Sequence, residues 1–217
     1  MSLPDLHAPL LRGLQQLALP LPADAVQKLV DYVALLHKWN SAYNLTAVRD
    51  PLAMVSRHLL DSLAVVAHLR GERFADVGTG AGLPGIPLAL ACPDRHFTLV
   101  DSNGKKIRFV TQAIAELQLR NVDAIQCRVE SWRPPVRFDG VLSRAFATLA
   151  DMAAGCSHLL ADDGALFALK GIYPAQELSA LPEHYTVDAC LPLQVPDADG
   201  ERHLVILRPG SAQAGEA

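Results

Sequence analysis

The chain has 217 residues, half of them apolar, and a formal net charge of −4 at neutral pH. This length and composition predict a globular protein with a substantial core, built as one large domain or as a domain with an extension. The negative charge disfavours a nonspecific nucleic-acid coat but leaves room for a local basic patch.

Compartment and metal content are also constrained by the sequence. No apolar run approaches the roughly 18 residues that cross a membrane, and the N-terminus lacks the pattern of a secretion signal. The four cysteines (Cys92, Cys127, Cys156 and Cys190) lie far apart, without the paired spacing of zinc sites. We therefore expect a cytoplasmic protein with reduced thiols, no metal and no membrane partner.

Residues 1–70 have the apolar spacing of helices. A leucine-rich run comes first, and a second run over residues 26–36 follows a predicted N-cap at Asp24. Asp50-Pro51 predicts the start of a third helix. We expect these helices to form an N-terminal extension that packs on the body of the protein.

From Arg73 onward, short apolar runs of strand length alternate with helical stretches. The predicted strands of this part are Phe74–Val77, Phe97–Val100, Val122–Cys127, Gly140–Leu142 and Ala165–Leu169. The predicted helices between them cover 84–92, 104–118 and about 147–160. Repeated β–α units predict a parallel sheet that is covered by helices on both faces.

The chain ends in a different pattern. Tyr185–Leu191 and His203–Leu207 read as two strands that are joined by a turn-rich segment without a helix. A hairpin here would add antiparallel strands to the parallel sheet. We therefore expect a Rossmann-like α/β domain over residues 71–217, preceded by the helical extension over 1–70.

The stretch Asp76–Gly85 (DVGTGAGLPG) joins the first strand of this domain to its first helix. Such a loop presents backbone N–H groups to a ligand, which makes it a cradle for a nucleotide or cofactor. Gly80, Gly82 and Gly85 fit the dinucleotide pattern G-x-G-x-x-G. Gly78, Gly80 and Gly82 equally fit acid-x-G-x-G-x-G, with Asp76 as the acid, which resembles S-adenosylmethionine-dependent methyltransferases.

Polar residues follow the later strands of the predicted sheet. Asp101 is placed to accept hydrogen bonds from ribose hydroxyls, or to cap the helix that follows it. Glu130 is placed to accept from an adenine amine, with Val129 against the adenine face; the alternative for Glu130 is a solvated surface position. Arg144 could pair with a cofactor carboxylate, an RNA phosphate or a protein carboxylate.

A second set of residues is predicted to contact RNA. Aromatic rings and amides in the second helix suit stacking on an unpaired base and reading its edge, although helix packing explains the rings equally well. These residues are Trp39, Asn40, Tyr43 and Asn44. Basic residues that could contact phosphate, or simply be solvated, are Arg49, Arg57, Lys170, Arg202 and His203.

Motifs along nearly the whole chain resemble one family. They are WNSAYNLT (39–46), HLLDSL (58–63), DVGTGAGLPGIP (76–87), LVDS (99–102), RVE (128–130), SRAFA (143–147), Lys170-Gly171 and ERHLV (201–205). In this order they resemble the bacterial small-subunit ribosomal RNA methyltransferase G family, also called glucose-inhibited division protein B. The resemblance implies a class I fold that binds S-adenosylmethionine.

The resemblance also implies an activity, which is methylation of N7 of one guanine in the 530 loop of 16S rRNA. The implied cofactor-binding residues are Gly78, Gly80, Gly82, Leu83, Asp101, Val129, Glu130 and Arg144. Guanine N7 is a lone-pair acceptor without a proton, so we expect no general base. We expect a monomer that acts on 16S rRNA or the small subunit. The alternatives are an NAD-binding oxidoreductase and a cofactor-binding regulator without turnover.

Overall fold

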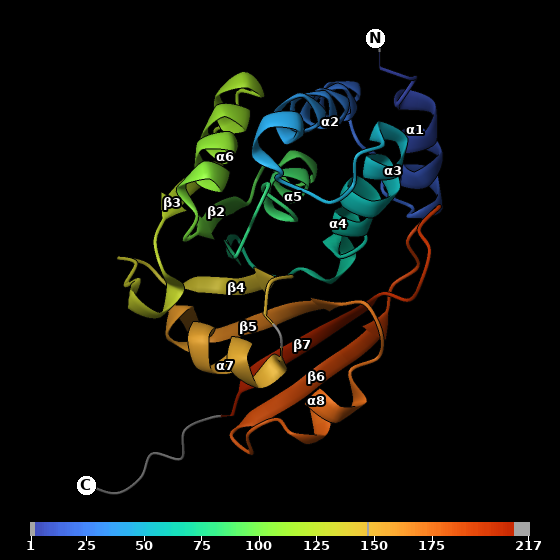
Figure 1. Ribbon diagram of the computed structural model, residues 1–217. Helices are drawn as coiled ribbons and strands as arrows, with labels where there is room; N and C mark the ends of the chain where they lie inside the picture. The colour runs from blue at the N-terminus through green and yellow to red at the C-terminus, as the bar shows by residue number, and fades with distance from the viewer. Residues whose placement is uncertain (1–2, 147, 211–217) are drawn as a thin grey trace, which may run out of the picture.

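Seven strands form one sheet in the order β3-β2-β1-β4-β5-β7-β6 (Figure 1). The parallel strands are β1 (Arg73–Val77), β2 (His96–Asp101), β3 (Val122–Gln126), β4 (Phe138–Ser143) and β5 (Leu160–Lys170). The strands β6 (Tyr185–Pro192) and β7 (His203–Pro209) form an antiparallel pair, and β7 is antiparallel to β5. The predicted Rossmann-like sheet with a closing antiparallel hairpin is confirmed.

The structure is a computed structural model, and it describes residues 3–146 and 148–210. Ala147, the last residue of the SRAFA motif and the first of the predicted helix 147–160, lies outside the described residues. Within those two ranges, no helix combines the length and the apolar character needed to cross a membrane.

The first 70 residues are helical, as predicted, but one cap differs. Helix α1 (His7–Gln16) is followed by α2 (Ala23–Tyr43), which starts directly after Pro22 without a side-chain cap. Asp24 lies inside the first turn of α2 and pairs with Lys28 at 3.2 Å, so its assignment as the N-cap was wrong. An acid in the first turn still interacts favourably with the helix dipole.

Asp50 caps the third helical segment through hydrogen bonds from the N–H groups of Leu52 and Ala53. This segment is continuous but changes its winding. It consists of α3 (Pro51–Met54), a π-helical stretch η1 (Val55–Leu60) and α4 (Asp61–Leu63), and the 3₁₀ turn η2 (Val66–His68) follows it. Single π turns inside α-helices are frequent at functional sites.

The remaining helices cover both faces of the sheet. They are α5 (Gly85–Ala91), α6 (Gly104–Glu116), α7 (Leu149–Cys156) and α8 (Ala175–Ser179), with 3₁₀ turns η3 (Val129–Ser131) and η4 (Ser157–Leu159). Helices α1 to α6 lie on one face, and α7 and α8 lie on the other (Figure 1). Asn103, not Asp101, caps α6, because its side chain accepts from Lys105 N.

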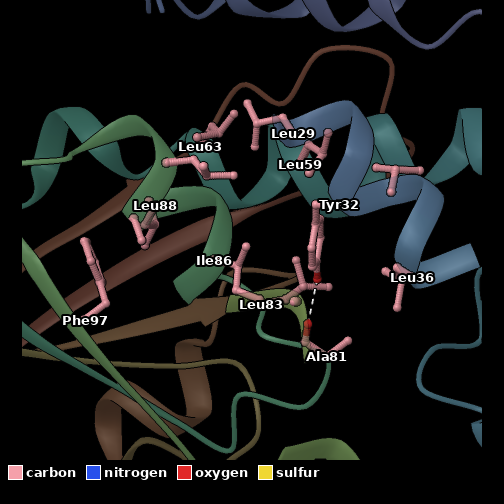
Figure 2. Close-up of a cluster of buried hydrophobic side chains, with 14 of the residues drawn as sticks. Leu29, Tyr32, Leu36, Leu59, Leu63, Ala81, Leu83, Ile86, Leu88 and Phe97 are labelled. Atoms are coloured by element: carbon pink, nitrogen blue, oxygen red, sulfur yellow. Dashed lines mark hydrogen bonds between the residues drawn. The ribbon is translucent and has the colours of Figure 1, made fainter. Parts of the chain in front are cut away.

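One hydrophobic cluster joins the N-terminal helices to the sheet, and it includes Leu29 and Leu36 of α2 together with Phe97 of β2. Figure 2 shows Tyr32 of α2 pointing from this cluster toward the glycine loop, where its hydroxyl donates to the Ala81 carbonyl at 2.7 Å. Burial raises the pKa of Tyr32, so the hydroxyl remains a donor at neutral pH. The helical extension therefore holds the loop in place.

Candidate active site

A cleft of about 160 Å³ lies where the first four parallel strands end, and we call it the loop cleft. Its lining residues are Val77, Gly78, Val100, Asp101, Ser102, Cys127, Arg128, Val129, Glu130, Ala145 and Phe146. Four of the predicted cofactor residues are thereby brought together: Gly78, Asp101, Val129 and Glu130. The carboxyl ends of parallel strands are where open α/β sheets bind ligands.

Three glycines of the loop have positive φ angles, which are +70° at Gly78, +61° at Gly80 and +86° at Gly82. A side chain at Gly82 would overlap Ile86, so this glycine is required by packing inside the protein. A Cβ at Gly80 would meet only the Gly78 carbonyl, at 4.0 Å. Gly80 therefore presents bare backbone to open space, as a ligand cradle requires.

Asp76, the acid of the glycine motif, stabilises the loop through hydrogen bonds from inside the protein. Its carboxylate is fully buried, and one oxygen accepts from Thr79 Oγ1 at 2.6 Å and from Gly85 N at 2.9 Å. The other oxygen, Oδ1, has no hydrogen-bond partner in the described part of the chain. Burial raises the pKa of Asp76 to about 6. The motif acid thus joins both ends of the loop.

Asp101 lies at the end of β2 and is already engaged. Its carboxylate accepts from Gly80 N at 3.0 Å and Asn103 N at 2.9 Å, and Lys106 Nζ lies 3.4 Å away. A carboxylate has about four lone-pair positions. One position therefore remains for a ribose hydroxyl, where the sequence prediction assumed room for two.

Val129 and Glu130 lie in η3, directly after β3. The Val129 side chain is buried against the wall of the loop cleft, whereas Glu130 is exposed. This placement leaves the Glu130 carboxylate free to turn toward a bound base. Leu83 differs, because its side chain packs in the hydrophobic core beneath the loop and is not part of the cleft lining. Any ligand contact of Leu83 would have to use its backbone.

A second cleft, of about 250 Å³, lies beyond the ends of β4 and β5, and we call it the basic cleft. Its lining residues are Asp61, Arg144, Leu169, Lys170, Gly171, Leu193, Arg202 and His203. The start of β7 reaches this edge because it pairs in antiparallel register with the end of β5, which sets Lys170 opposite His203. The hairpin thereby carries three predicted RNA-contacting residues to one place.

Asp61 organises the cations of the basic cleft. Its carboxylate is 6% exposed, and it binds Arg144 Nη1 at 3.2 Å and Arg202 Nε at 2.7 Å. Lys170 pairs with Glu177 at 2.8 Å. The sequence prediction included both arginines as site residues, whereas Asp61 appeared only within the HLLDSL motif.

Arg144 occupies a different place from the one expected. It lines the basic cleft and not the loop cleft, and its partner is a protein carboxylate. It still acts on the glycine loop, because its charge lowers the pKa of Asp76 against the larger effect of burial. Arg144 therefore interacts electrostatically on both sides, with Asp61 in the basic cleft and with Asp76 beneath the glycine loop.

The predicted RNA-contacting residues of α2 divide into two groups. Trp39 stacks on Tyr43 with ring centroids 5.1 Å apart and meets Phe109 edge-on at 5.7 Å. This is helix packing, the alternative that the sequence left open for the rings. Asn40 is 3% exposed, and its amide bonds Thr46 N and the Val48 carbonyl. The prediction that Asn40 reads an RNA base was therefore wrong. Its amide instead holds the segment between α2 and α3 in place.

Of the other predicted residues, Asn44 and Arg57 are exposed and His203 is buried. Asn44 ends α2 in a left-handed conformation, and its side-chain oxygen accepts from Arg49 at 3.2 Å. Arg57 is exposed and lies 3.4 Å from Asp199, in the turn between β6 and β7. His203 is 9% exposed, and its Nδ1 lies 3.4 Å from the Gly171 carbonyl.

Comparison with known proteins places this geometry in one family. The family model described as rRNA small subunit methyltransferase G matches residues 25–205. The Ribosomal RNA small subunit methyltransferase G of Photobacterium profundum is 54% identical over 198 residues, which are 91% of this chain and 96% of its own. The protein of the same name from Escherichia coli O1:K1 / APEC is 55% identical over 181 residues, with 83% and 87% covered.

Solved structures agree on the fold. The mitomycin 7-O-methyltransferase MmcR has a TM-score of 0.62 at 15% identity, over 82% of this chain and 60% of that chain. The DhpI–SAH complex has a TM-score of 0.55 at 17% identity, over 86% and 99%. The relatives do not favour the oxidoreductase or regulator alternatives. The chain belongs to the rRNA small subunit methyltransferase G family, and it is a methyltransferase that acts on ribosomal RNA.

Proposed function

We propose that this protein transfers the methyl group of S-adenosylmethionine to N7 of one guanine in the 530 loop of 16S rRNA. The observation that carries the proposal is the pair of clefts at one sheet edge. The loop cleft offers bare backbone and carboxylates, and the basic cleft offers three cations. A methyl donor and an RNA nucleotide require these two surroundings side by side.

The loop cleft suits S-adenosylmethionine in its chemistry. The methionine part would pass over Gly80, where open backbone permits close approach, and beside Gly78, where Ala145 leaves no space for a side chain. The ribose would donate to the remaining lone pair of Asp101, and the adenine would lie against Val129 with its amine toward Glu130. The bound donor supplies an electrophilic methyl group on a sulfonium centre.

Arg144 is the candidate partner of the donor's carboxylate. Its guanidinium presents five N–H donors, of which Nη1 faces Asp61. A second carboxylate can therefore pair with the same side chain without displacing Asp61. This arrangement would let Arg144 connect the donor to the basic cleft.

The reaction needs alignment more than proton transfer. Guanine N7 has a lone pair and no proton, so its attack on the methyl carbon needs no base. Holding nucleophile and methyl group in line accounts for most of the acceleration in such a reaction. Positive charge moves from sulfur to the purine during transfer, and a carboxylate on the RNA side, such as Asp61 in the basic cleft, would favour that change electrostatically.

The RNA would enter from the basic cleft. Arg202, Lys170 and His203 are placed to contact phosphate, and Arg57 and Arg49 would extend this contact along the rim. Tyr43 and Asn44 lie at the end of α2 as a more distant contact. Because the chain as a whole has a net charge of −4, the electrostatic attraction of RNA would come from these basic residues and not from the protein surface in general. We propose a cytoplasmic monomer that acts on 16S rRNA, either free or within the small subunit.

The test uses small subunits from a bacterial strain that lacks this protein. Purified protein and radiolabelled S-adenosylmethionine are added, and the product is mapped by borohydride reduction and aniline cleavage, which cut RNA at N7-methylguanine. We expect one cleavage, in the 530 loop of 16S rRNA. Label on another base, or on another guanine, would contradict the proposed substrate. An absence of label with every form of 16S rRNA would contradict the activity.

A further inference from the structure

A third hollow, of about 690 Å³, opens beside the basic cleft, and we call it the outer hollow. It is lined by Tyr173, by residues 192–195 and by the residues at the start of β7. Leu193, Arg202 and His203 line both the basic cleft and the outer hollow. The two spaces are therefore adjacent, and a strand of RNA that runs along this side of the protein would contact both.

The rim of the outer hollow exposes apolar side chains that the fold does not need. Ile172 is 76% exposed and Tyr173 is 52% exposed, in the segment that follows Lys170 and Gly171. The Tyr173 ring meets His203 nearly edge-on, with centroids 5.6 Å apart and planes at 72°. The ring is thus positioned by one contact while about half of its surface stays in solvent.

The polar lining of the hollow contains the Glu201 carboxylate together with groups that suit an anionic, flat ligand. Arg202 lines the hollow, and Arg57 lies close by, 3.4 Å from Asp199 in the β6–β7 turn. Gln194 adds an exposed amide, which offers both donors and an acceptor to a base edge. An unpaired nucleotide has an apolar face, a polar edge and a phosphate, and it matches all three features.

We propose that the outer hollow binds the unpaired nucleotide next to the target guanine, with its base stacked on Tyr173 and its phosphate beside Arg202. Proteins read single-stranded RNA by stacking splayed bases on aromatic side chains. Two exposed side chains are too little apolar surface for a stable protein interface, which buries about 1,200 Å² or more in total. The inference rests on the proposed function, since it assigns a neighbour to the same RNA.

The test compares RNA kinetics of three variants with those of the wild type. Tyr173→Ala is expected to raise KM for 16S rRNA about tenfold, with an unchanged dissociation constant for S-adenosylmethionine. Tyr173→Phe keeps the ring and should retain the wild-type KM. Leu11→Ala is the matched control, because Leu11 is also 52% exposed but lies on α1; it should leave KM unchanged.

An unchanged KM in Tyr173→Ala would overturn the inference, and so would a Tyr173→Phe variant that behaves like Tyr173→Ala. A photoreactive 4-thiouridine next to the target guanine adds a direct readout, with crosslinks expected in the peptide that contains Ile172 and Tyr173. Crosslinks confined to other peptides would also overturn it. Failure of the proposed function is distinguishable, because the wild-type protein itself would then leave 16S rRNA unmethylated.

Discussion

The loop cleft and the basic cleft share one edge of the sheet but are built in opposite ways. The loop cleft combines Val77 and Gly78, at the start of the glycine loop, with residues at or directly after the ends of β2, β3 and β4, and each of these short segments follows a strand. The basic cleft takes its character from side chains on four separate segments, which carry Asp61, Arg144, Lys170 and Arg202. Both sites are assembled by the fold, but the loop cleft is lined by segments that directly follow strands, whereas the basic cleft depends on ion pairs between distant side chains.

This difference determines how each site can fail. In the loop cleft, a change in one glycine alters the surface that a ligand touches. In the basic cleft, the loss of one carboxylate releases two arginines that lie far from it in sequence. Variants should therefore separate the two sites, with cofactor affinity responding to one and RNA affinity to the other.

The largest effect is expected from Gly80→Val. At φ +61° a β-branched side chain is strained, and it would project into the open space over the loop. We expect the affinity for S-adenosylmethionine to fall by about 100-fold or more, which is about 2.7 kcal/mol. Calorimetric titration measures this change.

Gly171→Val is the matched control for that experiment. Gly171 also faces open space, with no atom within 4 Å of an added Cβ, but it lies in the basic cleft. The affinity of this variant for S-adenosylmethionine should equal that of the wild type. Equal losses in both variants would show that the loop cleft is not the donor site.

The next effect is expected from Asp61→Ala. Removing the carboxylate leaves Arg144 and Arg202 without their shared partner, and we expect the free energy of unfolding to fall by about 2 kcal/mol. This estimate lies below that for a fully buried pair, because both guanidiniums are partly exposed. Urea unfolding measures the change, and KM for 16S rRNA should rise in parallel.

Asp61→Asn serves as its control. An amide oxygen keeps one acceptor for Arg202 while removing the negative charge. This variant should recover part of the stability and leave the donor affinity close to wild type. Wild-type stability and KM in Asp61→Ala would mean that the carboxylate does not organise the basic cleft.

Asp101→Ala should weaken donor binding by about tenfold, because one hydrogen bond from the ribose to a charged acceptor is lost. The loop also loses the acceptor of Gly80 N. Asp101→Asn keeps an acceptor oxygen, and its affinity for S-adenosylmethionine should lie between those of the wild type and Asp101→Ala. Titration with S-adenosylmethionine gives the three affinities, and equal values in all three proteins would remove Asp101 from the site.

Stability should respond to acid through two buried groups that oppose each other. Burial raises the pKa of Asp76 from 3.8 to about 6. Its contribution to the free energy of unfolding is therefore present below about pH 4 and is lost as pH rises through 6. Burial lowers the pKa of His58 from 6.5 to about 4, so its contribution is present above about pH 6.5 and is lost as pH falls toward 4.

Between about pH 4 and pH 6, the free energy of unfolding falls with rising pH because of Asp76 and rises with pH because of His58, and in the wild-type protein the two changes largely cancel. Asp76→Asn removes one of them, and its stability should then decrease more steeply with acid than that of the wild type. His58→Gln removes the other and should show the reverse slope. Urea unfolding across this range measures both, and identical pH profiles for all three proteins would contradict the assignment.

The smallest effect is expected from Arg57→Ala. The pair with Asp199 is exposed, so its loss should change the free energy of unfolding by less than about 1 kcal/mol. RNA affinity should weaken slightly, and its salt dependence should decrease by about one phosphate contact. A salt titration of RNA binding measures this, and an unchanged slope would place Arg57 outside the RNA path.

The sequence predicted the sheet, its closing hairpin and four of the residues that line the loop cleft, because those depend on local patterns. Alternating apolar runs determine strands, and a glycine loop after β1 has one place to lie in such a sheet. Caps were less predictable, since Asp24 and Asn103 compete with neighbouring residues for the same geometry. The N-cap residues keep an extended backbone, with ψ of 150° at Pro22 and 109° at Asn103, and the cap therefore depends on the residue at which the backbone turns helical.

The basic cleft was predictable only in part. Arg202 and Lys170 were singled out as basic residues, but the pairing of β5 with β7 is what brings them together. Asp61 carries no local motif that marks it as the partner of two distant arginines. The burial of Asn40 was equally hidden, because an amide beside two aromatic rings reads the same whether it faces RNA or the protein.

The most direct test of the two-cleft account is one matrix of affinities, in which Gly80→Val and Arg202→Ala are each titrated with S-adenosylmethionine and with a 16S rRNA fragment that contains the 530 loop. The account predicts that Gly80→Val loses the donor and retains RNA, whereas Arg202→Ala retains the donor and binds RNA more weakly. Loss of the same ligand in both variants would contradict the division of the site into a donor cleft and an RNA cleft.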